Sequence, residues 1–211
     1  MIDLLAYEKE LYNEGYELIC GTDEAGRGPL AGPVVAAAVI LPKNMIIEGV
    51  NDSKQLTEKK REELFDIINE KALAVGISFI DNKKIDEINI LEASRLAMMT
   101  AIKNLKIKPD YVLSDAMKMN IDIPVKPIIK GDALSINIAA ASIIAKVSRD
   151  RFMDEMDLKY PNYGFKRHKG YPTKDHIEAI KKYGITDIHR LTFKPIKTML
   201  VEQLEFDFDE K

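Results

Sequence analysis

The sequence predicts an α/β protein in which helices cover a mixed β-sheet. Two strand candidates follow one another directly, at residues 17–22 and 34–41, before any long helix. Further along the chain, strand candidates alternate with helix candidates, which is typical of helices packed on a sheet. The length of 211 residues and the hydrophobic content of 46 % fit a chain with one core.

The first elements follow from apolar periodicity and from turn residues. Residues 4–15 read as a short amphipathic helix that ends at a glycine. Glycines and prolines separate the strands at 17–22 and 34–41, which predicts a tight and unusual turn. Thr57 is a candidate N-cap for a helix at 58–71, and a third strand is expected at 73–80.

The second half of the chain alternates short strands with longer helices. Asn89 is expected to cap a helix that runs to about residue 105, with apolar residues along one side. The long helix at 136–156 is small and apolar at first and charged later. The other expected elements of this half are strands at 111–113 and 125–129 and a helix at 173–183 that Gly184 closes.

Composition excludes several classes of protein. With 31 basic and 34 acidic residues the net charge is −3, so bulk positive charge does not hold this chain to nucleic acid, and any basic surface must be local. The single cysteine, Cys20, excludes a disulfide framework and a cysteine-rich zinc site. The three histidines (His168, His176 and His189) are scattered, so we expect no histidine metal cluster and assign them exposed or structural roles.

Targeting signals are not evident. The longest apolar run, residues 32–41, is about half of the ~20 residues that a membrane span needs. The charged N-terminus does not resemble a signal peptide. We therefore expect a soluble, cytoplasmic protein with no membrane partner.

Four carboxylates follow strand candidates. Asp23 and Glu24 directly follow the first strand, Asp115 the fourth and Asp132 the fifth. Neighbouring residues of a strand face opposite sides, so Asp23 and Glu24 share a site only if the strand ends or bulges there. Four such acids repel one another without a cation, and oxygen-only sites suit Mg2+ or Mn2+. The alternative is that each acid is an ordinary turn or helix-cap residue.

Basic and polar segments are candidates for holding phosphates. Residues 165–173 are basic and contain Tyr171, whose ring could stack on a base or a sugar. Lys54 lies in a polar loop, while Ser142 and Lys146 are four residues apart and share one helix face. The alternatives are a solvated loop with Tyr171 in the core, ordinary loop chemistry and an ordinary helix face.

Six motifs resemble those of the ribonuclease HII family, the bacterial type 2 ribonucleases H, and they occur in the family's order. The resemblance covers roughly residues 17–193. The motifs are DEAGRGPLAGPVV at 23–35, NDSK at 51–54, IDEINIL at 85–91, KGD at 130–132, AAASIIAKVSRD at 139–150 and HKGYPT at 168–173.

This resemblance implies a ribonuclease H-like fold, with a mixed five-stranded sheet flanked by helices. Together with the residue patterns, it predicts a catalytic domain with C-terminal helices at 17–200, between an N-terminal helical extension at 1–16 and an acidic tail at 201–211. It also implies hydrolysis of RNA in RNA–DNA hybrids, incision at single ribonucleotides embedded in duplex DNA, and 3′-hydroxyl and 5′-phosphate ends.

The resemblance also implies roles for individual residues. The family's four catalytic, metal-binding carboxylates match Asp23, Glu24, Asp115 and Asp132. Its ribose-reading element matches Gly26, Arg27 and Gly28, and its junction-sensing tyrosine matches Tyr171. Lys54, Ser142 and Lys146 match positions near the substrate backbone. Two Mg2+ or Mn2+ ions are the implied cofactors.

One position departs from the family pattern. The family places glycine after its third carboxylate, whereas Ala116 follows Asp115 here. The added methyl group changes little unless this residue needs a positive φ angle. Asp110 is the nearest competitor for the third carboxylate, but it precedes the strand rather than following it.

Two functions are alternatives to a hybrid-cleaving endonuclease. The main one is a hybrid-binding protein without turnover. A type 3 ribonuclease H shares the fold but carries an extra N-terminal domain and a different fourth carboxylate, and only about 16 residues precede the first strand here. The resemblance favours a monomer. The segment 203–208 (QLEFDF) loosely resembles a peptide that binds sliding clamps, the alternative being a solvated acidic tail.

Overall fold

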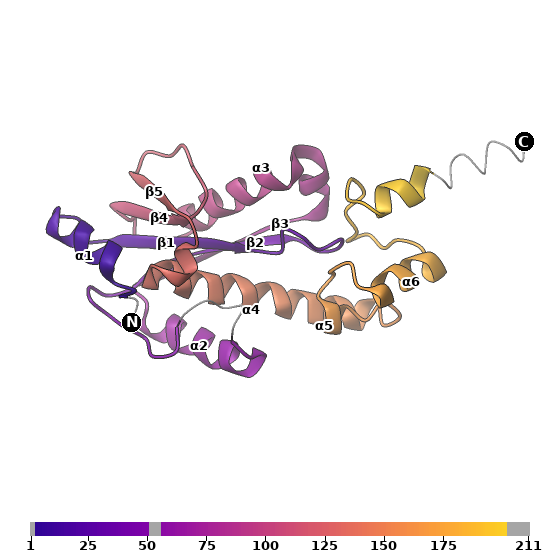
Figure 1. Cartoon of the computed structure of the whole chain (residues 1–211), viewed down its shortest axis with the longest axis horizontal. Helices are drawn as coiled ribbons and strands as arrows, with labels where there is room; N and C mark the ends of the chain where they lie inside the picture. Colours follow the sequence, from indigo (N-terminus) through magenta and orange to yellow (C-terminus); the bar gives the residue numbers. More distant parts are fainter. Residues whose placement is uncertain (1–2, 51–55, 202–211) are drawn as a thin grey trace, which may run out of the picture.

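The computed structural model describes residues 3–50 and 56–201, and Lys54 and the segment 203–208 lie outside them. A five-stranded sheet in the order β3-β2-β1-β4-β5 lies between helices (Figure 1). The predicted mixed five-stranded sheet with flanking helices is confirmed. The elements are α1 (Ala6–Asn13), β1 (Ile19–Ala25), β2 (Val34–Ile40), α2 (Glu58–Lys71), β3 (Ala74–Ile80), α3 (Asn82–Lys103), β4 (Tyr111–Asp115), β5 (Val125–Ile128), η2 (Gly131–Ala133), α4 (Ile136–Lys159), α5 (Phe165–His168) and α6 (Lys174–Tyr183).

The central strand of the sheet is β1, which has a different kind of neighbour on each side. It pairs antiparallel with β2 from Cys20 to Ala25, and parallel with β4, where Thr22 is the partner of Ser114. β5 pairs parallel with β4. The carboxyl ends of β1, β4 and β5 therefore lie at one edge, where the predicted acids follow.

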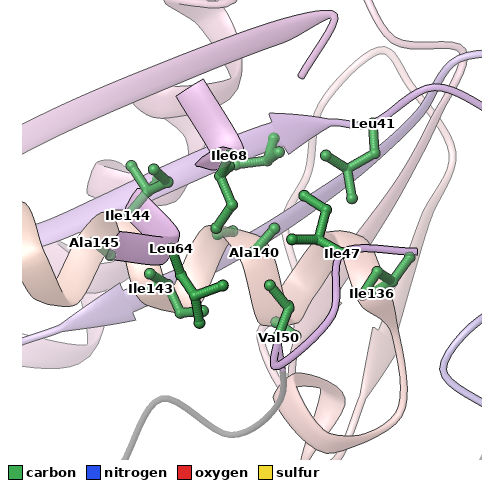
Figure 2. Close-up of a cluster of buried hydrophobic side chains, with 14 of the residues drawn as sticks. Leu41, Ile47, Val50, Leu64, Ile68, Ile136, Ala140, Ile143, Ile144 and Ala145 are labelled. Atoms are coloured by element: carbon green, nitrogen blue, oxygen red, sulfur yellow. The ribbon is translucent and has the colours of Figure 1, made fainter. Parts of the chain in front are cut away.

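Helices cover both faces of the sheet: α3 lies above it and α2 and α4 lie below it in the view of Figure 1. Figure 2 shows the lower core, where Leu64 and Ile68 of α2 point toward Ala140, Ile143 and Ile144 of α4. All these side chains are buried, as is the whole of β2, which explains its continuous apolar run.

The contact between α4 and β1 depends on a glycine. A Cβ atom on Gly21 would lie 2.1 Å from the carbonyl carbon of Asn137, so only glycine lets the first turn of α4 approach the strand this closely. This contact runs α4 along the same strand that carries Asp23. The helix therefore carries Ser142 and Lys146 toward the edge where the acids lie.

Helix α3 differs from its prediction. It begins at Asn82, with Asp81 as N-cap, rather than at Asn89. Asn89 nevertheless has a non-helical φ of 66°, and its side chain accepts hydrogen bonds from the backbone N–H groups of Leu91 and Glu92. The predicted cap is therefore confirmed, but it caps the second segment of a kinked helix.

The C-terminal part of the described chain forms a separate small core beyond the end of the sheet. It contains α5, which the sequence analysis did not predict, α6, and a helical turn at 196–201. Phe165, Tyr163, Ile180 and Ile196 pack there against Leu30 of the turn between β1 and β2. Within residues 3–50 and 56–201, no helix is long and apolar enough to cross a membrane.

Candidate active site

The two adjacent acids lie at the open end of β1. The strand continues on the β2 side as far as Ala25, so it neither ends nor bulges before Glu24, contrary to the prediction. On the other side, pairing with β4 stops at Thr22 and Ser114. Among the described strands none pairs with that side of β1 from Asp23 onward, and both acids line one cavity with Asp115 at the end of β4.

These acids share one cavity of about 350 Å³ with most of the predicted substrate-contacting residues. The cavity brings together segments that are far apart in the sequence, from β1, β4, α4 and the segment after α5. Its lining residues are Asp23, Glu24, Ala25, Gly26, Arg27, Gly28, Asp115, Ser142, Lys146 and Tyr171.

Asp115 is tied to the segment that carries Asp132. Its Oδ1 accepts a hydrogen bond of 2.8 Å from the backbone N–H of Gly131, the residue before Asp132. Asp132 is buried in the short helix η2 and does not line the cavity. The structure thus brings Asp23, Glu24 and Asp115 together, and Asp132 is buried in the neighbouring segment that is bonded to Asp115.

The competitor Asp110 lies at the opposite end of β4. Its carboxylate accepts hydrogen bonds from the backbone N–H groups of Glu17 and Leu18, just before β1. It therefore fixes the start of the parallel pair and lies away from the cavity. Ala116, in contrast, has a φ of 50°, so the departure from the family's glycine falls at a position where an L residue is strained.

The acidic side chains of the cavity repel one another. Burial, and then the charges of Glu24 and Asp115, raise the pKa of Asp23 well above its usual value. Hydrogen bonds from the Ser142 hydroxyl and the Glu24 N–H act in the other direction. Burial also raises the pKa of Glu24, which Arg27 lowers and Asp115 raises. The ionised acids are therefore destabilised in this site as it stands.

A divalent cation fits this set of donors. Glu24 accepts a 3.2 Å hydrogen bond from Arg27 on Oε1, while its Oε2 is buried without a hydrogen-bond partner among the described residues. All the acidic donors are oxygens, which suits Mg2+ or Mn2+. Across residues 3–50 and 56–201, no three acidic, histidine or cysteine side chains already stand as a complete ligand set.

Another part of the cavity lining consists of the Gly26–Gly28 backbone and one aromatic ring. Gly26 has a φ of +97°, and a Cβ atom there would lie 2.1 Å from Nε of Arg149. A Cβ atom on Gly28 would only reach ordinary contact, 3.6 Å from the Tyr171 ring. Gly26 is therefore required by the fold, whereas Gly28 leaves room in the cavity. Tyr171 is 43 % exposed, so its ring is available to a ligand.

Lys146 belongs to a charged group at the α4 side of the cavity. Its Nζ donates a 2.6 Å hydrogen bond to Asp150, which also lies 3.9 Å from Arg61. Burial lowers the pKa of Lys146, and Asp150 opposes this effect. The lysine is thus held beside the acids by a partner on its own helix.

A buried histidine network, which the sequence did not predict, lies next to the Tyr171 backbone. His176 Nδ1 donates to the Tyr171 carbonyl at 2.9 Å, which leaves its Nε2 as an acceptor. His189 Nδ1 accepts from the Thr186 N–H, so its Nε2 donates to His176 at 3.1 Å. Burial lowers the pKa of both rings to about 4. His168 stacks on His176, so the three histidines are structural but not scattered.

Two buried arginines, Arg149 and Arg190, were also missed as parts of this region. Arg149 lies inside the 139–150 motif, where a charged residue on an apolar helix face was the available signal. Arg190 lies in a segment without any motif, and the sequence gives no signal for it.

Comparisons with known proteins identify the family. The family model described as Ribonuclease HII matches residues 20–196. A ribonuclease HII of Acetivibrio thermocellus is 63 % identical over 193 residues, which cover 91 % of this chain and 75 % of that protein. A ribonuclease HII of Acholeplasma laidlawii is 59 % identical over 199 residues, which cover 94 % and 98 %.

Solved structures agree with this result. Ribonuclease H2 from Pyrococcus horikoshii superimposes with a TM-score of 0.74 at 30 % identity, covering 86 % of this chain and 96 % of the other. A Bst-RNase HIII structure, at 18 % identity and a TM-score of 0.66 over 88 % of this chain and 70 % of the other, shows the shared fold alone. The chain belongs to the ribonuclease HII family, whose members are endonucleases that cut the RNA strand of RNA–DNA hybrids.

Proposed function

We propose that this ribonuclease also incises duplex DNA on the 5′ side of a single embedded ribonucleotide, leaving 3′-hydroxyl and 5′-phosphate ends. One observation carries the proposal: the acids at the ends of β1 and β4 line the same cavity as Gly26, Gly28 and Tyr171. A site that reads one sugar and holds the adjacent phosphodiester at carboxylates suits a cut at one defined bond.

Asp23, Glu24, Asp115 and Asp132 are proposed to hold two Mg2+ or Mn2+ ions. When bound, two such ions supply the activation of water and the stabilisation of the leaving oxygen. The buried Glu24 oxygen without a partner and the mutual repulsion of Asp23, Glu24 and Asp115 support this assignment. Asp132 is included because the hydrogen bond from Gly131 ties its short helix to Asp115.

The backbone of Gly26–Gly28 is proposed to recognise the ribose 2′-hydroxyl, the group that distinguishes RNA from DNA at one position. Only Gly28 is free of both a positive φ and a close contact, so its missing side chain leaves space for a sugar. Tyr171 faces Gly28 and is proposed to stack on the deoxyribose that follows the ribonucleotide.

Three polar residues are proposed to lie near the substrate backbone. Ser142 hydrogen-bonds Asp23 and lines the cavity, and Lys146 supplies positive charge beside it. Lys54 is proposed from the family resemblance alone. With a net charge of −3, attraction to phosphates must come from local cations such as Lys54 and Lys146. We therefore expect binding to weaken as the salt concentration rises.

The test is cleavage of a DNA duplex that carries one ribonucleotide, assayed in Mg2+, in Mn2+ and in EDTA. We expect one metal-dependent cut on the 5′ side of the ribonucleotide. A protein that cuts continuous hybrids but leaves this duplex intact would contradict the roles of Gly26–Gly28 and Tyr171. Binding without cleavage of either substrate would favour the hybrid-binding alternative.

A second proposal concerns the segment 203–208, which resembles a clamp-binding peptide. A ribonuclease HII of Archaeoglobus fulgidus, 27 % identical with a TM-score of 0.70 over 84 % of this chain and 95 % of the other, was solved as a complex with PCNA. We propose that the enzyme is a monomer and that it binds a sliding clamp through this segment. Deletion of residues 201–211 should then abolish clamp binding without changing cleavage, and unchanged clamp affinity would refute the proposal.

A further inference from the structure

Arg149 and Arg190 are fully buried, and both donate to the turn between β1 and β2. Arg190 donates to the backbone carbonyls of Gly26 at 2.7 Å, Arg27 at 3.0 Å, and Gly32 at 2.8 and 3.0 Å. Arg149 donates to Ala31 at 3.1 Å and Pro33 at 3.0 Å. The turn 26–33 is therefore closed around two guanidinium groups.

The geometry of the peptide unit gives these bonds a consequence for the cavity. In a trans peptide, the C=O of one residue and the N–H of the next point in opposite directions. Because Arg190 draws the carbonyls of Gly26 and Arg27 toward itself, the N–H groups of Arg27 and Gly28 point away from it. Both residues line the cavity, and their N–H groups donate to no acceptor among the described residues.

Arg149 connects the turn to the wall that carries Tyr171. Its third bond runs to the carbonyl of Lys169, at 3.0 Å, and the N–H of Leu30 donates to Gly170 at 2.8 Å. The ring of Tyr171 and the backbone of Gly28 are thereby held next to one another in the lining of the cavity.

The hydrogen bonds of both guanidinium groups go to backbone carbonyls, and within residues 3–50 and 56–201 neither group forms an ion pair with a carboxylate. Burial lowers the pKa of Arg149 to about 10 and of Arg190 to about 9, and Arg149 lowers that of Arg190 further. Two buried like charges are costly for stability alone. Their donors serve backbone carbonyls, so neither arginine is placed to hold a substrate phosphate directly.

We propose that Arg149 and Arg190 are positioning residues that orient two backbone N–H groups, of Arg27 and Gly28, for the substrate sugar and fix Tyr171 beside them. This inference rests on the proposed ribose-reading function of Gly26–Gly28. The guanidinium charges also polarise these peptide units and strengthen their N–H groups as donors.

The experiment compares Arg190→Lys and Arg149→Lys with wild type and with Arg151→Lys. Lysine keeps the charge but cannot bridge several carbonyls at once. Arg151 lies on the same helix but is exposed and pairs with Glu62, so its variant is the matched control. Two variants are used so that a folding failure of one leaves the other informative.

The first readout is amide hydrogen exchange, which needs no substrate. The N–H groups of Leu30 and Gly32 are bonded to Gly170 and Ile188, so they should be protected in wild type. Arg190→Lys and Arg149→Lys should each accelerate exchange at these two amides at least ~10-fold, while amides of the β1–β2 ladder stay protected. Unchanged exchange at both amides in both variants would overturn the inference that the two arginines hold the turn 26–33 in place.

The second readout is cleavage, and it distinguishes the positioning role of the arginines from the proposed function. With saturating Mn2+, Arg190→Lys and Arg149→Lys should each lose kcat/KM on the single-ribonucleotide duplex, on the order of 10²-fold for a displacement of about 1 Å. Mn2+ affinity should not change. Exchange that accelerates while kcat/KM stays at the wild-type value would overturn the positioning role. If wild type does not cut this duplex, the proposed function fails, and the exchange result still decides whether the two arginines hold the turn 26–33 in place.

Discussion

Replacing Asp23 by Asn should stabilise the protein in the absence of divalent cations. The substitution keeps the shape of the side chain and an Oδ1 that accepts from the Glu24 N–H, now at 2.7 Å. It removes a charge that is buried beside two other acids, Glu24 and Asp115. What is lost is therefore mainly desolvation cost and repulsion.

The sign of the gain follows from the pKa of Asp23, which burial and then the charges of Glu24 and Asp115 raise well above the usual value. The ionised carboxylate therefore costs folding free energy, and the amide removes that cost. A gain of roughly 1–3 kcal/mol at pH 7 is expected, within the range of large single-residue effects. For a chain of this size, each kcal/mol moves Tm by roughly 2–4 °C.

The assay is thermal and urea unfolding of wild type and Asp23→Asn at pH 7 in EDTA. The control is Asp110→Asn, because Asp110 accepts two backbone N–H bonds and an amide oxygen accepts them less well. We expect Asp23→Asn to be more stable than wild type and Asp110→Asn to be less stable.

Adding Mg2+ or Mn2+ should then stabilise wild type more than Asp23→Asn, by about 2.7 kcal/mol when the cation is at ~100 times its Kd. Two results would refute the reasoning. One is an Asp23→Asn variant no more stable than wild type in EDTA. The other is an equal effect of the cation on both proteins.

Three further predictions concern single positions. Gly28→Ala places a methyl 3.6 Å from the Tyr171 ring without backbone strain, so it should fold normally yet lower kcat/KM on the single-ribonucleotide duplex at least ~10-fold, and wild-type turnover would contradict this. Ala116→Gly relieves a φ of 50° and should raise the free energy of unfolding in urea by about 0.5–1 kcal/mol, whereas a loss would show that the residue is not strained. Burial keeps His176 and His189 neutral, with pKa values of about 4 against the usual 6.5. Their contribution to the free energy of unfolding is therefore complete above pH 6.5 and is lost as the pH falls through 4. Tm should drop over that range, and NMR titration of either ring at pH 6.5 would contradict the network.

Local signals predicted the elements well because the relevant forces act over a few residues. Thr57 caps α2, whose observed bounds, Glu58–Lys71, are those predicted. All five expected strands are present, and their ends differ from the prediction by at most three residues. The first segment of α3, which was not predicted, begins at Asn82 after its N-cap Asp81. Asp81 and Asn89 are both good N-cap residues, and the prediction used only the second, so the predicted helix was too short.

The site was predicted in part, because strand ends meet at one edge of a sheet and the acids follow strands. What escaped prediction depends on long-range packing. Arg190 is 158 residues from the Gly32 carbonyl that it binds, and no local pattern reports such a bond. The histidines are likewise brought together only when α5, α6 and the segment before residue 190 form the small C-terminal core.

The most direct test of the central claim is to measure cleavage and binding of the same RNA–DNA hybrid by wild type and Asp23→Asn, with Mg2+ and with Mn2+. The carboxylate assignment predicts that Asp23→Asn loses cleavage in both metals and binds the hybrid with nearly wild-type Kd, because the basic and backbone contacts remain. Cleavage by Asp23→Asn at a rate close to that of wild type would contradict the claim that the acids at the end of β1 hold the catalytic ions.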